Sequence, residues 1–177
     1  ESNGKSATLE GARVARPTSP IVWGTSGTNA QHSFFQQLHQ GPDIVPVDFV
    51  VAREGRTPPA YDGDDRHRIL VANCVAQAAA LALGREPADG DLHRAFPGDR
   101  PSTLFTLPRL DARSLGALLA CWEHATFTAA VVLGINPFDQ FGVEYGKVMA
   151  SSVESLLAGS DVEGIDAATR ASVARLR

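Results

Sequence analysis

The sequence contains few cysteines and few aromatic residues. Only two of its 177 residues are cysteines, and aromatic residues make up 7%. Cys74 and Cys121 lie within apolar helical patterns and do not have the short mutual spacing of a metal site. This usage is typical of small core residues in a reducing compartment, so we expect a cytoplasmic protein without a metal centre.

Positive charge is also scarce. The chain has 16 Lys and Arg against 20 Asp and Glu, which gives a net charge of −4, and the cations form no stripe. Proteins that bind nucleic acid neutralise phosphates with clustered cations. Nucleic acid is therefore not an expected partner.

Long hydrophobic runs are missing as well. The longest candidate, residues 115–133, is interrupted by Glu123 and His124 and falls short of the roughly 20 apolar residues of a membrane span. We therefore expect no membrane partner. The first residues lack the pattern of a signal peptide and do not begin with Met, which fits a processed or truncated chain.

What remains is an ordinary globular composition with alternating strand and helix patterns. Apolar residues make up 44% of the chain and charged residues 20%. Short apolar runs predict buried strands, with helical periodicity between them. This order indicates an α/β fold with a parallel sheet and crossover helices. The predicted strands are residues 20–24, 44–51 (with Pro46 at a start or edge position) and 102–107.

Two long helices have clear boundary signals. Asp64 or Asp65 is the expected N-cap of a helix that Gly84 stops, and Asp111 is the expected N-cap of a second helix. In the loop between them, Arg100 is better explained as a solvated or structural arginine than as a phosphate ligand. The side chains expected to face inward are Leu70, Cys74, Ala78 and Leu81 in the first helix, and Leu115, Leu118, Leu119 and Trp122 in the second.

The most informative stretch, residues 136–147, opens another helix. The apolar pattern predicts a helix over about 137–158, with a glycine stop directly after it. Positions i, i+4 and i+7 share a helix face. An amide, a carboxylate and an ammonium, those of Gln140, Glu144 and Lys147, are therefore expected to project together.

Two glycines inside this helix separate two interpretations. A solvated Glu144–Lys147 pair, worth a few tenths of a kcal/mol, has no need of glycine. Gly142 and Gly146 each cost about 1 kcal/mol relative to alanine in a helix interior. Close approach of a ligand or of another backbone would explain that cost, and spacing alone leaves both interpretations open.

A second stretch begins with a Gly, Ser and Thr loop at residues 24–27 and ends at Gly41. Thr28 and Gln31 have the spacing of a capping box at the start of a helix. A strand, such a loop and a helix N-terminus form a natural anion site, although the P-loop and dinucleotide fingerprints are absent. The helix dipole would keep His32 neutral and able to accept a proton, whereas a surface histidine without a role is the alternative. The expected buried stripe is Phe34, Phe35 and Leu38.

Several segments together resemble one family. They are Gly27-Thr-Asn-Ala-Gln-His-Ser-Phe34, Phe138-Asp-Gln-Phe-Gly-Val-Glu-Tyr-Gly-Lys147 and the opening Glu1-Ser-Asn-Gly-Lys5. In sequence and spacing they resemble glucose-6-phosphate isomerase (phosphoglucose isomerase). The resemblance runs over nearly the whole chain but covers only the C-terminal part of the family's chain, so we expect a C-terminal fragment.

The resemblance implies a fold and a reaction. The fold would be a three-layer α/β/α SIS-type domain with a mainly parallel sheet, lacking its first elements, over residues 1–159, with a helical tail over 160–177. The reaction would be the aldose–ketose interconversion of glucose 6-phosphate and fructose 6-phosphate in glycolysis and gluconeogenesis. Acid/base proton transfer through an enediol(ate) needs neither a cofactor nor a metal.

The resemblance also implies roles for individual residues. Glu1 would be the base that moves the proton between C1 and C2, and nothing else in the sequence supports that role. His32 and Lys147 would assist ring opening, with His32 reaching the site of the partner subunit in a homodimer. Gln140 would contact the substrate near its phosphate.

The chain departs from the family pattern at Thr25, Ser26 and Ala30, where the family usually has Glu, Pro and Gly. The family's other half, with its Ser/Thr phosphate loop and enediolate-stabilising arginine, is not in this chain, so we expect the chain alone to be inactive. A phosphosugar-binding regulatory SIS module without catalysis is the main alternative, and a protein-interaction domain is a third. A pure binder would not need a base, a histidine and a lysine together, which favours the enzyme.

Overall fold

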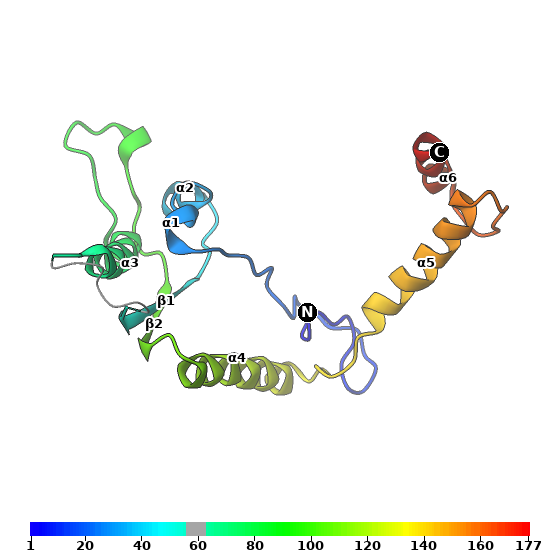
Figure 1. The fold of residues 1–177 in the computed structure, drawn as a ribbon, viewed down its shortest axis with the longest axis horizontal. Helices are drawn as coiled ribbons and strands as arrows, with labels where there is room; N and C mark the ends of the chain where they lie inside the picture. Colours follow the sequence, from blue (N-terminus) through cyan, green and yellow to red (C-terminus); the bar gives the residue numbers. More distant parts are fainter. Residues whose placement is uncertain (56–62) are drawn as a thin grey trace. The chain divides into compact units, whose positions relative to one another are not determined.

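The computed structural model describes residues 1–55 and 63–177, and the chain in it divides into two compact units. The first unit combines Glu1–Pro20 with His124–Arg177, and the second is Ile21–Glu123. Figure 1 shows the elements of both along the chain. The part of the expected 52–64 loop that covers residues 56–62 lies outside the described residues.

The second unit is built on a parallel β–α–β arrangement. Strand β1 (Val47–Glu54) pairs in parallel with β2 (Ser102–Arg109), so that Val47 lies opposite Ser102. Helix α3 (Arg66–Leu83) connects the two strands and packs against both. Pro46 directly precedes β1, where its missing N–H costs no ladder hydrogen bond. These elements confirm the expected α/β class with a parallel sheet.

The predicted strand at residues 20–24 is wrong. The segment has no regular structure, and Ile21 and Val22 are 91% and 85% exposed. A strand needs a hydrogen-bonded neighbour, and the sheet in the described part of the chain consists of β1 and β2 alone. The apolar run therefore has no strand to pair with.

The helix expected to end at Gly41 is divided in two. Helix α1 (Gly27–Ala30) has Ser26 rather than Thr28 at its N-cap position, and after a turn at residues 31–34 the chain enters α2 (Phe35–Gln40). The predicted apolar stripe is largely confirmed, because two of its three members are buried and the third is half-buried. The core around it consists of Ala30, Phe35, Leu38 and Leu81, with Phe34, Val45, Val47 and Phe49 packed against them.

Arg100 has a structural role. Its side chain is buried, with the residue 8% exposed, and it donates hydrogen bonds to the carbonyl oxygens of Gly41 (2.7 Å) and Asp43 (3.1 Å). It thus ties the end of α2 to the start of β2. Between α3 and β2 the chain forms the short 3-10 helix η1 (Leu92–Arg94).

Helix α4 (Ala112–Leu133) begins as expected but is buried less than expected. The carboxylate of Asp111 accepts a hydrogen bond from the backbone N–H of Ser114 at 2.8 Å, which confirms the N-cap. Of the four side chains predicted to face inward, Leu118 is buried, whereas Leu115, Leu119 and Trp122 are exposed. With 22 residues, α4 is also long and apolar enough to cross a membrane. The expectation that no stretch approaches a membrane span is therefore wrong, although core helices of soluble proteins pass the same test.

The first unit contains α5 (Phe141–Leu157) and α6 (Ala167–Leu176). Helix α5 begins four residues later and ends one residue earlier than predicted, with Gly159 adopting a φ of 102° after it. The side chain of Asp166 caps α6 by accepting hydrogen bonds from the N–H groups of Ala168 and Thr169. The two helices share a core of Leu156, Ile165 and Val173, with Met149, Val153 and Val162 packed against it.

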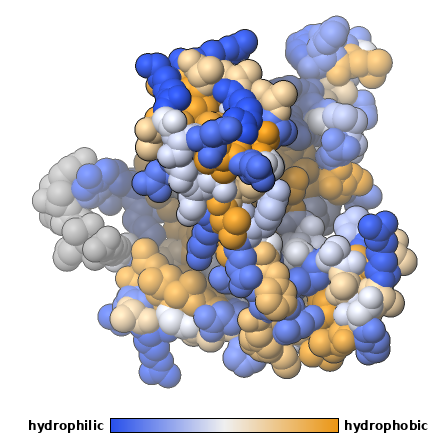
Figure 2. Space-filling model, turned by 90° about the vertical axis from the view of Figure 1, so that its right-hand side faces the viewer, coloured by the Kyte–Doolittle hydropathy of each residue, from blue (hydrophilic) through white to orange (hydrophobic). Residues whose placement is uncertain are grey.

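The two cysteines differ in exposure. Cys74 is half-buried, and burial raises the pKa of its thiol, whereas Cys121 is exposed on α4. The expectation that both are core residues is wrong for Cys121, because the outer face of α4 is uncovered in the described chain. Apolar side chains reach the surface elsewhere as well, and Figure 2 shows them as orange areas among hydrophilic ones.

Candidate active site

The N-terminal segment of the first unit is a turn held by its own backbone and by α4. The N–H of Gly4 donates to the carbonyl oxygen of Glu1 at 2.9 Å, and the N–H of Lys5 donates to that of Asn3 at 2.8 Å. The side-chain amide of Asn3 donates to the carbonyl oxygen of Thr126 at 3.0 Å. The segment that carries Glu1 is therefore fixed at its third residue, while the Glu1 side chain itself is exposed.

An ion pair joins this segment to the chain that leads into α5. The ammonium of Lys5 lies 2.6 Å from a carboxylate oxygen of Asp139 and donates a second hydrogen bond, of 2.5 Å, to the backbone carbonyl oxygen of the same residue. The two side chains are 14% and 26% exposed. The N-terminal segment consequently lies beside the segment before α5 (Figure 1).

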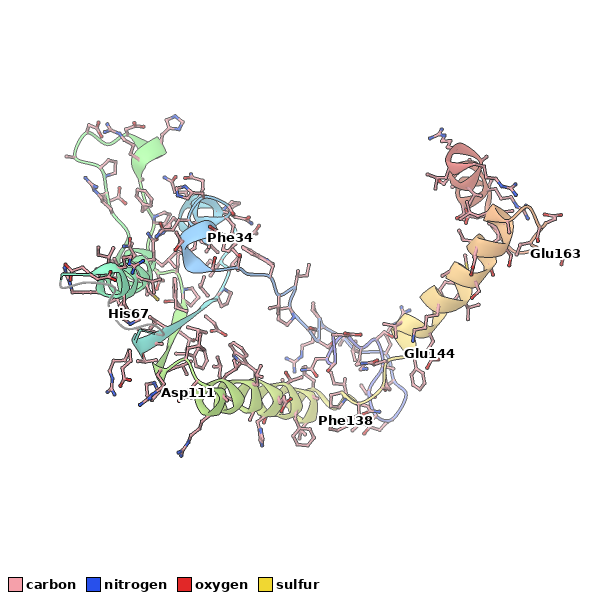
Figure 3. The ribbon with its side chains drawn as sticks, in the orientation of Figure 1. Phe34, His67, Asp111, Phe138, Glu144 and Glu163 are labelled. Atoms are coloured by element: carbon pink, nitrogen blue, oxygen red, sulfur yellow. The ribbon has the colours of Figure 1, made fainter. Side chains whose placement is uncertain are left out.

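The segment before α5 is itself ordered by local contacts. The side-chain oxygen of Asn136 accepts a hydrogen bond from the N–H of Phe138 at 3.0 Å, and the Phe138 ring lies 5.9 Å from that of Phe127, centroid to centroid. Figure 3 labels Phe138 in this segment and Glu144 in the first turn of α5. The chain that enters α5 is thus held by the contacts of Asn136 and Phe138 and by the ion pair of Asp139.

Gln140 lies at the boundary of α5 and not inside it. It is the N-cap residue, with φ −135° and ψ 33°, and its carbonyl oxygen accepts from the N–H of Val143 at 3.0 Å. The shared-face argument, which assumed helical geometry at Gln140, therefore holds only for Glu144 and Lys147. The helix starts later because the chain from Asn136 to Asp139 is held by the contacts described above.

Glu144 and Lys147 both lie on α5 and are exposed. The ion pairs between described residues do not include one between these two, which weakens the interpretation as a solvated Glu–Lys pair. A side chain added at Gly142 or Gly146 would meet nothing within 4 Å. The described residues bring no other backbone near the two glycines, so a ligand, or chain outside these residues, remains as the explanation for them.

His32 belongs to the second unit. It lies in the turn between α1 and α2 and is exposed, and its backbone N–H donates to the carbonyl oxygen of Asn29 at 3.2 Å. The prediction that a helix dipole keeps this imidazole neutral assumed a continuous helix. Because α1 ends at Ala30, His32 is not in the first turn of a helix, and that argument no longer applies.

The second unit also contains a groove of about 520 Å³. His39 lies in it, with its Nε2 3.0 Å from the side-chain oxygen of Gln77. The remaining lining is mixed polar and apolar and does not include His32; it consists of Gln31, Phe35, Gln36, Ala80, Gly84, Arg85 and Phe96.

The four residues predicted for the site thus fall into both units. Glu1, Gln140 and Lys147 belong to the first, where the Lys5–Asp139 pair joins their two segments, and His32 belongs to the second. Sequence reasoning missed Lys5 and Asp139. Both lie inside the segments that carry the family resemblance, but a pairing across 134 positions leaves no periodic signal. In the described part of the chain, no group of three or more His, Cys, Asp or Glu side chains could hold a metal ion.

Comparison with known proteins gives a consistent result. Residues 1–173 match the sequence profile of the family described as Phosphoglucose isomerase. The chain is 57% identical over 153 residues to glucose-6-phosphate isomerase of Sphingopyxis alaskensis, with 86% of this chain and 30% of the relative covered. It is 55% identical over 175 residues to the same enzyme of Rhizorhabdus wittichii, with 99% and 33% covered.

A solved structure agrees in fold. The crystal structure of a glucose-6-phosphate isomerase from Chlamydia trachomatis superposes with a TM-score of 0.83 at 40% identity, covering 99% of this chain and 33% of that one. The expected fold class, α/β of the SIS type with a mainly parallel sheet, is thereby confirmed. The chain spans about a third of the length of the relatives it matches, as expected for a resemblance to part of the family's chain.

Proposed function

Because this chain belongs to the phosphoglucose isomerase family, we propose that it forms the C-terminal third of an aldose–ketose isomerase that interconverts glucose 6-phosphate and fructose 6-phosphate. The observation that carries the proposal is the ion pair of Lys5 with Asp139, which brings together two of the three segments that match the family's motifs. Lys5 and Asp139 are 134 positions apart in the sequence, so the fold is what brings these two segments into contact. The reaction would serve glycolysis and gluconeogenesis in the cytoplasm.

In this proposal Glu1 is the base. Its carboxylate takes the proton from C2 of the open-chain aldose and returns it to C1, which a single carboxylate can do because the two carbons are adjacent. The negative charge that develops on the enediolate needs hydrogen-bond donors or cations.

Lys147 and His32 assist ring opening, and Gln140 contacts the substrate near its phosphate. Ring opening moves a proton from the anomeric hydroxyl and places one on the ring oxygen, which suits an ammonium and an imidazole. The exposed amide of Gln140 at the N-cap of α5 lies where the helix dipole favours an anion. Neither a metal nor a cofactor takes part.

We also propose that the enzyme is a homodimer and that His32 serves the site of the partner subunit. Its exposed position in a turn, in a different unit from Glu1 and Lys147, is compatible with that role. The isolated 177-residue chain is expected to have no turnover, because the phosphate loop and the enediolate-stabilising arginine implied by the family resemblance are outside it.

A coupled assay of fructose 6-phosphate conversion to glucose 6-phosphate tests the proposal. It uses the full-length protein, meaning this chain together with the remaining two-thirds of a family-length protein. Robust turnover is expected, and Glu1→Gln should reduce it by roughly 10²–10⁴-fold, the usual contribution of general acid–base catalysis.

The second candidate is a regulatory module that binds phosphosugars without catalysis, and the departures at Thr25, Ser26 and Ala30 would be the first residues to examine in that case. If the folded full-length protein binds glucose 6-phosphate but does not convert it, the isomerase proposal is wrong and the regulatory module is the function to adopt.

A further inference from the structure

We propose that Lys5 and Asp139 are a positioning pair, which holds the segment of Glu1 in register with the start of α5, where Gln140 and Lys147 lie. The inference rests on the proposed isomerase function and adds two residues to it. Neither residue touches the reacting carbons in this role. Both act through the segments that they join.

The environment of the pair makes it a fixed contact. A surface ion pair contributes little, because its side chains are mobile and screened by salt. Among the ion pairs between described residues, however, Lys5 is the least exposed cation, at 14%, since the cations of the other pairs are 40% exposed or more.

The geometry is also more restrictive than that of a single ion pair. One ammonium donates both to the carboxylate of Asp139 and to the backbone carbonyl oxygen of the same residue. The second bond involves the main chain one residue before Gln140, so a movement of Lys5 would change the entry into α5 directly. Charge-assisted hydrogen bonds of this length are the stronger class.

Glu1 depends on such anchors because its own side chain has none. Within the described residues its carboxylate is exposed and makes no hydrogen bond. Its position is set by the turn to Gly4, by Asn3 on α4 and by Lys5 on Asp139. The turn is internal to the segment, the hydrogen bond of Asn3 fixes the segment to α4, and the ion pair of Lys5 fixes it to the chain that carries Gln140 and leads to Lys147.

The test measures proton transfer in the full-length protein with Lys5→Met, which keeps most of the side chain's bulk and removes its charge. We expect kcat to fall about 10–100-fold, because a misplacement of about 1 Å is enough for such a loss. KM should change less than about threefold if the phosphate contacts are kept. With glucose 6-phosphate deuterated at C2 as the substrate, the kinetic isotope effect should rise, since the step performed by Glu1 becomes slower.

Three further variants give the controls. Lys5→Arg should recover most of kcat, because a guanidinium can still reach the carboxylate, and Asp139→Asn should give an intermediate loss, because its amide oxygen still accepts. These two variants test the pairing even if Lys5→Met does not fold. Arg68→Met removes an exposed ion pair with Asp65 in the other unit and should leave kcat and the isotope effect unchanged.

The failure of this inference differs from the failure of the proposed function. An inactive wild-type protein would overturn both, whereas an active one would leave the pair to be judged by its variants. The positioning role is wrong if folded Lys5→Met and Asp139→Asn proteins keep kcat within about twofold of wild type. It is equally wrong if kcat falls while the isotope effect stays at the wild-type value.

Discussion

The guanidinium of Arg100 donates a hydrogen bond of 2.7 Å to the carbonyl oxygen of Gly41, across 59 residues of sequence. A second hydrogen bond, to the carbonyl oxygen of Asp43, makes this buried side chain the link between the end of α2 and the start of β2. A planar group with several donors in fixed directions is suited to two carbonyl oxygens at once. The link supports the unit that carries His32.

Arg100→Met should therefore destabilise the protein by roughly 2–4 kcal/mol, because two part-buried carbonyl oxygens lose a charged donor. Arg100→Lys should recover only part of this loss, since an ammonium cannot reproduce the fork. Urea denaturation of the full-length protein measures both losses, as the change in the free energy of unfolding in the first unfolding transition. Equal stability of Arg100→Met and wild type would show that water replaces the side chain.

Gly41→Ala should destabilise the same region. A methyl group there would lie 2.5 Å from the carbonyl oxygen of Gln37, a backbone atom of α2 that cannot move without disturbing the helix. The expected loss is about 1–3 kcal/mol, as for other cases of overpacking. Gly116→Ala on α4 is the matched control, because its added methyl group would meet nothing within 4 Å. A loss of stability in the control as well would remove the steric explanation.

Gly142→Ala and Gly146→Ala should separate stability from activity. Each site lies in α5 with open space around it, so alanine should stabilise the helix by up to about 1 kcal/mol. If a ligand approaches this face, the same substitutions should raise KM for the sugar phosphate several-fold. Melting temperature and steady-state kinetics of the full-length variants test this, and more stable variants with unchanged KM would count against a ligand at α5.

Asp111 should make the start of α4 sensitive to acid. The hydrogen bond from the N–H of Ser114 lowers the pKa of this carboxyl from its ordinary value of 3.8. A carboxyl whose pKa is lower in the folded state stabilises that state above its unfolded pKa, and the contribution is lost as the pH falls through the folded pKa. The loss is therefore expected below about pH 4.

The variant Asp111→Asn is the matched test, because asparagine also caps helices but does not titrate in this range. It should have nearly the wild-type melting temperature at pH 7 and a smaller decrease between pH 4 and pH 2. The prediction is contradicted if the two proteins lose stability in parallel over that range.

Sequence patterns located features that depend on near neighbours. The cap at Asp111 and the glycine stops after α3 and α5 were predicted correctly, because each depends on a local hydrogen bond or on the φ of one residue. The strand expected over 44–51, by contrast, begins at Val47, directly after Pro46. The family motifs likewise named Glu1, His32, Gln140 and Lys147 as site residues, which remain predictions. The alternation of short apolar runs with helical periodicity also predicted that β1 and β2 are parallel strands connected by α3.

Tertiary structure alone decided the rest. The run at residues 20–24 has strand composition, but a strand exists only with a partner, and β1 and β2 provide none for it. The start of α5 moved to Phe141 because contacts around Asp139 hold the preceding segment. The pairing of Lys5 with Asp139 joins residues 134 positions apart, and such a contact is set by the packing of whole segments, to which no short-range pattern is sensitive.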